Sequence, residues 1–190
     1  MSIFKLRFVI FIIVIKYGYI SIDGIRLPFE KVLRVNRFVD CPEYRHLPLS
    51  FQDVRFIPSG KSYYVTAKIV ASRNIDSNLK LLLKFERCKS KENLDSCEPY
   101  NDLHIKNICQ MTLADKKPWT PFVSSVRPPL SFPLKKGTYI AQNGSFDADA
   151  LSFFPINGFF WKVRAKIYEG SYEEETPIMC TYVEGEIINV

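Results

Sequence analysis

Apolar and polar side chains alternate with a period of two in three stretches of the chain. The stretches span 63–71, 79–86 and 159–168, and in the second stretch only Leu82 interrupts the alternation. Such a pattern is typical of a strand with one buried and one solvated face. Shorter strand candidates lie at 31–38, 51–57 and 180–188. The pattern therefore predicts an all-β protein of about seven or eight antiparallel strands.

One window follows helical spacing instead. Apolar or small residues recur every three or four positions at Ile105, Ile108, Cys109, Thr112 and Leu113. This spacing predicts a single short helix at about 102–114, which Pro118 ends.

Residues 1–21 have the pattern of a secretory signal peptide. Lys5 and Arg7 precede the apolar run 8–15, and Lys16 ends that run well short of the roughly 20 residues that a bilayer-spanning helix needs. A membrane anchor is the alternative. We expect cleavage between Gly18 and Ser21, followed by one domain over 22–190.

Removal of residues 1–21 changes the charge of the chain. The net charge is +6 for all 190 residues, and without Lys5, Arg7 and Lys16 it falls to +3, from 23 basic and 20 acidic residues. This mild excess does not favour a nucleic-acid partner.

Five cysteines follow the predicted signal peptide. An exported chain favours disulfides, but an odd number leaves one thiol over unless it pairs between chains. Cys88 and Cys97 flank the polar turn 89–96 and are positioned to bridge its base. No Cys-x-x-Cys occurs and the chain has only two histidines, so a metal site is disfavoured.

Nothing in the sequence favours an enzyme. His46 and His104 lie near no Gly-x-Ser-x-Gly elbow, and there is no phosphate loop or dinucleotide fingerprint. We expect neither catalysis nor a cofactor. Asn143-Gly144-Ser145 is a sequon, and it predicts a glycosylation site at Asn143.

The segment 153–160 is unusually apolar for a surface connection. Pro155, Asn157 and Gly158 are turn residues, but aromatic and aliphatic residues surround them. We expect Phe153, Phe154 and Ile156 to be covered by a lipid or a membrane, or else to fold inward onto the core.

These residues carry a family resemblance. The run 133–139 reads Pro-Leu-Lys-Lys-Gly-Thr-Tyr, the apolar loop ends at Gly158, and a late cysteine, Cys180, follows a charged strand. The pattern resembles the ML-type lipid-recognition group, which includes the ganglioside activator of lysosomes, a cofactor of β-hexosaminidase, and insect CheB-like chemosensory proteins. The similarity extends upstream over Val65 to Met111.

The resemblance implies a fold and a binding site. The fold would be an antiparallel β-cup, a two-sheet sandwich around an apolar cavity, with one short helix. Phe153, Phe154 and Ile156 would form a membrane-contact loop beside the mouth. Eight inward-facing residues would line the cavity: Val65, Ile69, Leu81, Leu83, Phe85, Trp161, Val163 and Ile167.

The resemblance also implies a disulfide between Cys41 and Cys180, which match the first and last cysteines of the family. Cys109 matches a family cysteine whose partner position is Phe132 here, and Trp119 stands where the family has another cysteine. We therefore expect Cys109 to be a free, buried thiol.

Three functions remain open from the sequence. The first is a secreted or lysosomal lipid-binding protein that extracts, presents or transfers a lipid at a transient membrane contact, with a glycosidase as its protein partner. The second is a chemosensory accessory protein of the CheB kind, which acts with a receptor or channel. The third is a structural secreted protein whose core is filled by side chains.

Overall fold

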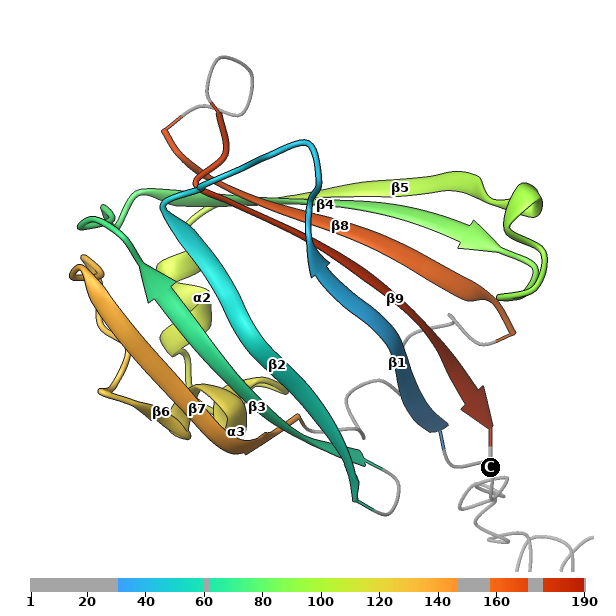
Figure 1. The fold of residues 1–190 in the computed structure, drawn as a ribbon, viewed down its shortest axis with the longest axis horizontal. Coiled ribbons are helices and arrows are strands. Elements are labelled where there is room, and N and C mark those ends of the chain that lie inside the picture. The colour runs from blue at the N-terminus through green and yellow to red at the C-terminus, as the bar shows by residue number, and fades with distance from the viewer. Residues whose placement is uncertain (1–30, 60–61, 147–157, 171–175, 190) are drawn as a thin grey trace, which may run out of the picture.

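A computed structural model of the chain describes residues 31–59, 62–146, 158–170 and 176–189. In these residues the protein is all-β, with two antiparallel sheets that face one another (Figure 1). The predicted all-β sandwich is therefore confirmed.

The five-stranded sheet has the order β1-β9-β8-β4-β5. Its strands span β1 (Lys31–Asp40), β9 (Met179–Asn189), β8 (Phe160–Glu169), β4 (Leu79–Cys88) and β5 (Glu98–Ile105). The four-stranded sheet has the order β2-β3-β7-β6. Its strands span β2 (Leu49–Ser59), β3 (Ser62–Ala71), β7 (Gly137–Ser145) and β6 (Val126–Arg127).

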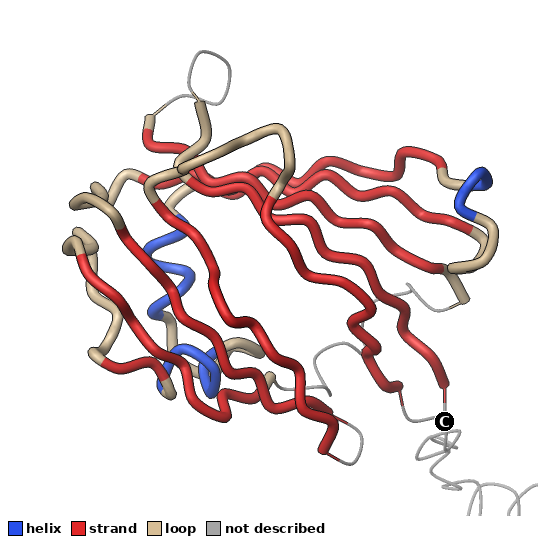
Figure 2. Tube along the Cα trace, in the orientation of Figure 1, coloured by secondary structure: helices blue, strands red, loops and turns tan. Residues whose placement is uncertain are grey.

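Helical segments are few in the described part of the chain. They are α2 (Ile108–Leu113), α3 (Thr120–Ser124) and the 3-10 turn η1 (Leu94–Ser96). Helices α2 and α3 lie behind the four-stranded sheet in Figure 2, and η1 lies at the distant tip of the β4–β5 hairpin.

The helix predicted at 102–114 is partly wrong. Residues 102–105 belong to β5, because they pair with β4, with Leu83 opposite Leu103 and Leu81 opposite Ile105. Strand pairing therefore overrides the local helical spacing, and the helix begins only at Ile108. The second helix, α3, was not predicted.

The two sheets are joined at one end, which we call the closed end. There the connections 41–48 and 72–78 cross between the sheets, and the Leu49 N–H donates to the Ile178 carbonyl at 2.9 Å. Ile75 bridges to Leu134 through two backbone hydrogen bonds of 2.8 and 2.9 Å. The buried core gathers here and includes Ile75, Leu79, Leu134 and Met179.

The sheets diverge toward the opposite, open end (Figure 1). The open end contains the last residues of β2, β4 and β7 and the first residues of β3 and β8, as the antiparallel registers require. The sequence between β7 and β8 leaves the described structure at Phe146 and returns at Gly158, both at this end.

Candidate functional site: an apolar cavity between the sheets

A cavity of about 500 Å³ lies between the two sheets. Its volume falls within the roughly 300–1,000 Å³ that is usual for small-molecule pockets. Only Thr112 and Thr181 contribute polar side chains to its 25 lining residues, and none of the 25 is charged. An interior of this composition suits an apolar guest, because an ionised group placed there would lose its hydration without gaining a partner.

The walls of the cavity come from strands of both sheets. Inward-facing residues of β4, β8 and β9 form one wall, and those of β2 and β3 form the other. Because successive side chains point to opposite faces of a strand, every second side chain of these strands faces the space between the sheets. Many of these side chains are only half-buried although they point inward, among them Phe51, Leu81, Leu83, Val163 and Ile167. Unfilled space next to them explains this exposure.

Six of the eight predicted lining residues contact the cavity. They are Val65 and Ile69 on β3, Leu81 and Leu83 on β4, and Val163 and Ile167 on β8.

Phe85 and Trp161 do not line the cavity, so the assignment of these two residues needs correction. They lie on the same inward-facing rows as Leu83 and Val163 but further toward the open end. There they pack against each other edge to face, with ring centroids 6.5 Å apart. Tyr100 also packs on Trp161, with ring centroids 5.2 Å apart, and Trp161 is only 8% exposed.

Several lining residues escaped the sequence analysis, for two reasons. On β2, Phe51 and Phe56 both line the cavity although five positions separate them, an odd interval that breaks the period of two. An irregularity between Gln52 and Arg55, with Asp53 at φ 51°, restores the inward direction. A second group of lining residues lies on α2, on α3 and in the segment 130–134, where no strand pattern exists to predict their direction.

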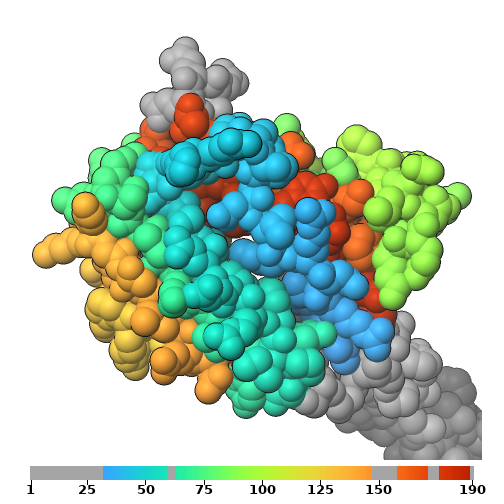
Figure 3. Space-filling view, viewed as in Figure 1, coloured from blue at the N-terminus to red at the C-terminus, as the bar shows by residue number. Residues whose placement is uncertain are grey.

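An aromatic cluster closes the gap between the edge strands β1 and β2. Phe38 of β1 lies 5.6 Å from Phe51 and 6.0 Å from Phe56, and Phe56 lies 6.3 Å from Tyr63. In the space-filling view, atoms of β1 and β2 meet along this face and leave only narrow gaps (Figure 3). Aromatic contacts therefore replace backbone hydrogen bonds where the two sheets come together.

The run 133–139 that carries the family resemblance has a structural role in this fold. Leu134 is a core residue, 3% exposed, and the Lys136 N–H donates to Asn74 Oδ1 at 2.8 Å. The Tyr139 hydroxyl donates to the Lys135 carbonyl at 2.9 Å. This run holds the start of β7 against the β3–β4 connection at the closed end, and Leu134 alone reaches the cavity wall.

Both predicted disulfides are present. Cys41–Cys180 closes a separation of 139 residues, and Cys88–Cys97 closes one of 9. Cys109 is free and buried, as expected, and burial raises the pKa of its thiol. Disulfides of this kind suit an oxidising lumenal or extracellular environment.

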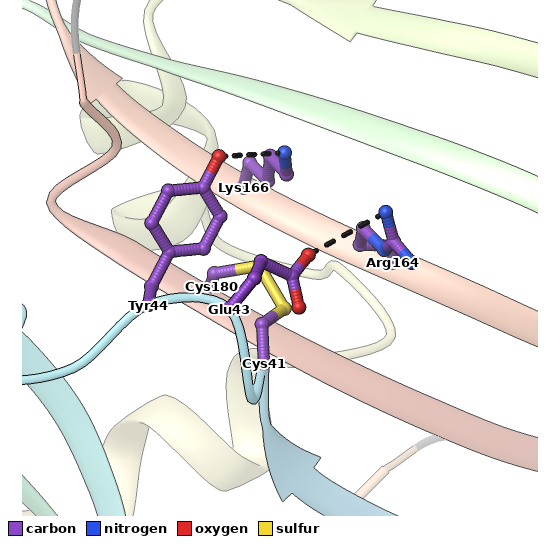
Figure 4. The surroundings of a disulfide bond; sticks show 6 residues. All are labelled: Cys41, Glu43, Tyr44, Arg164, Lys166 and Cys180. Carbon is purple, nitrogen blue, oxygen red and sulfur yellow. Dashed lines mark hydrogen bonds and ion pairs between the residues drawn. A yellow bond between two sulfur atoms is a disulfide. The ribbon is translucent and has the colours of Figure 1, made fainter.

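The Cys41–Cys180 disulfide belongs to a group of contacts that fixes the 41–48 connection to the outer face of the five-stranded sheet (Figure 4). Lys166 Nζ donates to the Tyr44 hydroxyl at 3.1 Å and lies 4.9 Å from the centre of its ring. Arg164 lies 3.5 Å from Glu43. The two sulfur atoms are bonded to each other, so this group offers no thiolate to a metal ion.

The remaining predicted residues lie elsewhere. Asn143 is exposed on β7 at φ 51°, within the irregular register between β3 and β7. His46 lies in the 41–48 connection and His104 on β5, and both are exposed. The predicted signal peptide, 1–21, and the predicted membrane-contact residues Phe153, Phe154 and Ile156 fall outside the described residues.

No protein-family model matches the chain, and no curated protein shows significant similarity to it. The resemblance to the ML-type group therefore stays a prediction. Among the described residues, no helix combines the length and apolar character needed to cross a membrane.

Proposed function

We propose that the protein is a secreted lipid-binding protein that holds an acyl or hydrocarbon chain between its two sheets. The observation that carries this proposal is the cavity of about 500 Å³, whose lining has no charged residue and only two hydroxyl groups. Burial of apolar surface contributes roughly 25 cal/mol per Å², so a chain enclosed by such walls binds without any specific polar contact.

The partial exposure of the wall side chains favours a ligand-binding cavity over a core that side chains fill completely. A sandwich whose core is complete buries its inward-facing side chains at the density of an organic crystal. Here Leu83, Val163 and Val183 face inward from three neighbouring strands and are still partly exposed. A hydrocarbon chain in the cavity would cover these side chains. Extraction, presentation or transfer of a lipid at a membrane is the role that the resemblance implies for such a site.

The test is native mass spectrometry of the protein purified from a eukaryotic secretory host. We expect one hydrophobic small molecule bound per chain, and we expect denaturation to release it. Titration of the emptied, refolded protein with dodecanol should then refill the site at one molecule per chain. A protein that emerges empty and takes up neither dodecanol nor a fatty acid would contradict the proposal.

A further inference from the structure

Arg87 lies at the open end of the cup, held between aromatic rings. Its guanidinium carbon is 5.3 Å from the centre of the Tyr100 ring and 5.2 Å from that of Phe159. Trp161 packs against both rings, at 5.2 Å from Tyr100 and 6.1 Å from Phe159. These contacts fix the plane and position of the guanidinium group.

Within the described part of the chain, one edge of this guanidinium group carries no hydrogen bond. Nε donates to Glu98 Oε1 at 2.7 Å, and Nη2 lies 2.6 Å from the same oxygen. Nη1 makes no hydrogen bond to any residue in the described ranges. A guanidinium group carries five N–H donors, and their planar arrangement matches the paired oxygens of a carboxylate or phosphate.

The place of Arg87 along β4 connects it with the cavity. Leu79, Leu81 and Leu83 line the cavity from successive inward-facing positions, and Phe85 and Arg87 continue that row to the open end. Arg87 is the first charged side chain in the row. It lies roughly 13 Å beyond Leu83, at about 3.3 Å of rise per residue. The cavity itself has no charged lining residue, so an anionic head group would remain outside it.

We propose that Arg87 binds the anionic oxygens of the head group of an amphiphile whose chain occupies the cavity. This inference rests on the proposed function. Glu98 competes with the head group for the guanidinium group, so it moderates the affinity. The site therefore favours a carboxylate or phosphate head over a neutral or cationic head on the same chain.

The experiment compares four ligands that share a dodecyl chain: laurate, dodecyl phosphate, dodecanol and dodecyltrimethylammonium. Each is titrated by calorimetry into the full secreted chain at neutral pH, below the critical micelle concentration of the charged ligands and below the solubility limit of dodecanol. We expect the two anions to bind roughly five- to tenfold more tightly than dodecanol, a preference that weakens as salt is added. Inorganic phosphate alone is the fifth titrant.

Three variants assign the effect to Arg87. Arg87→Gln should remove the preference for anions and leave dodecanol binding unchanged. Glu98→Gln should strengthen anion binding by severalfold, because the guanidinium group loses its internal partner; a purely structural role of the Arg87–Glu98 pair would not produce this gain. Arg164→Gln is the matched control. Arg164 is also paired with a glutamate and lies 5.5 Å from an aromatic ring centre, Tyr182, but on the outer face.

The outcomes separate the two proposals. If no ligand binds, the proposed function fails. If dodecanol binds but Arg87→Gln leaves the anion preference intact, the inference about Arg87 is wrong and the cavity stands. Saturable binding of inorganic phosphate alone that is lost in Arg87→Gln would assign the site to free oxyanions and overturn the head-group assignment.

Discussion

Leu79 and Leu83 lie on the same strand and the same inward-facing row, four residues apart, yet their surroundings differ. Leu79 is 2% exposed at the closed end, where both sheets and α2 converge. Leu83 is only half-buried, because the sheets have diverged and its neighbours face a cavity. Both leucines border the cavity, but Leu79 is also packed into the core, whereas Leu83 leaves more of its surface to the cavity. The same residue type therefore contributes more to stability at the closed end and more to the ligand site further along the strand. Sheet separation decides which role each side chain has, since residue type does not differ.

The two disulfides provide the first test of this comparison. Cys41–Cys180 lies at the closed end and Cys88–Cys97 at the open end. Removing the first by the double substitution to alanine should lower the free energy of unfolding by roughly 4–5 kcal/mol, and removing the second by roughly 2–3 kcal/mol, because the closed loops differ in length. Urea unfolding without reductant measures both. Equal losses of unfolding free energy would show that the chain entropy of the closed loop does not dominate the stabilisation by these disulfides.

Truncating the two leucines sharpens the comparison. Leu79→Ala should cost about 3–5 kcal/mol, since it leaves a new hole in a closed core. Leu83→Ala should cost roughly half as much or less, because more of the Leu83 side chain than of the Leu79 side chain already faces empty space. Both variants are compared by urea unfolding of the ligand-free protein. A larger loss for Leu83→Ala would mean that the open half is packed as tightly as the core.

A pH-dependent contact at the closed end should have the smallest effect. The Glu169 carboxylate accepts hydrogen bonds from Arg73, at 3.2 and 2.5 Å, and from the Asp76 N–H at 2.7 Å. These bonds hold the pKa of Glu169 below its usual range, with the Arg73 hydrogen bond as the main cause. The stabilisation is complete above the unfolded pKa and disappears as pH falls through the lower folded pKa.

Because Arg73 is half exposed, we expect this contribution to be about 1 kcal/mol or less. Unfolding free energies at pH 7 and at pH 3 should differ less in Glu169→Gln than in wild type. If both proteins show the same pH dependence over that interval, Glu169 is not responsible.

The sequence predicts the strands better than the space between them. The alternation at 63–71, 79–86 and 159–168 predicts which side chains face inward, and six predicted residues reach the cavity. It does not predict where the sheets separate. Phe85 and Trp161 therefore face inward as predicted, but they pack against each other instead of lining the cavity. Phe51 and Phe56 were missed as a pair because a backbone irregularity lies between them, and Phe132 was missed because it belongs to no regular element.

The central claim is that an unfilled, ligand-accessible cavity lies between the sheets, and filling it tests that claim most directly. Val163→Phe adds a ring at the cavity wall, and Ile57→Phe adds a ring to an exposed position of β2, as the matched control. Uptake of dodecanol by both variants is measured alongside their urea unfolding. We predict that Val163→Phe weakens binding at least about tenfold with little loss of stability, because the ring enters empty space, whereas Ile57→Phe leaves binding unchanged. Unchanged binding by a folded Val163→Phe, or a loss of stability of about 1–3 kcal/mol typical of an overfilled core, would contradict the account.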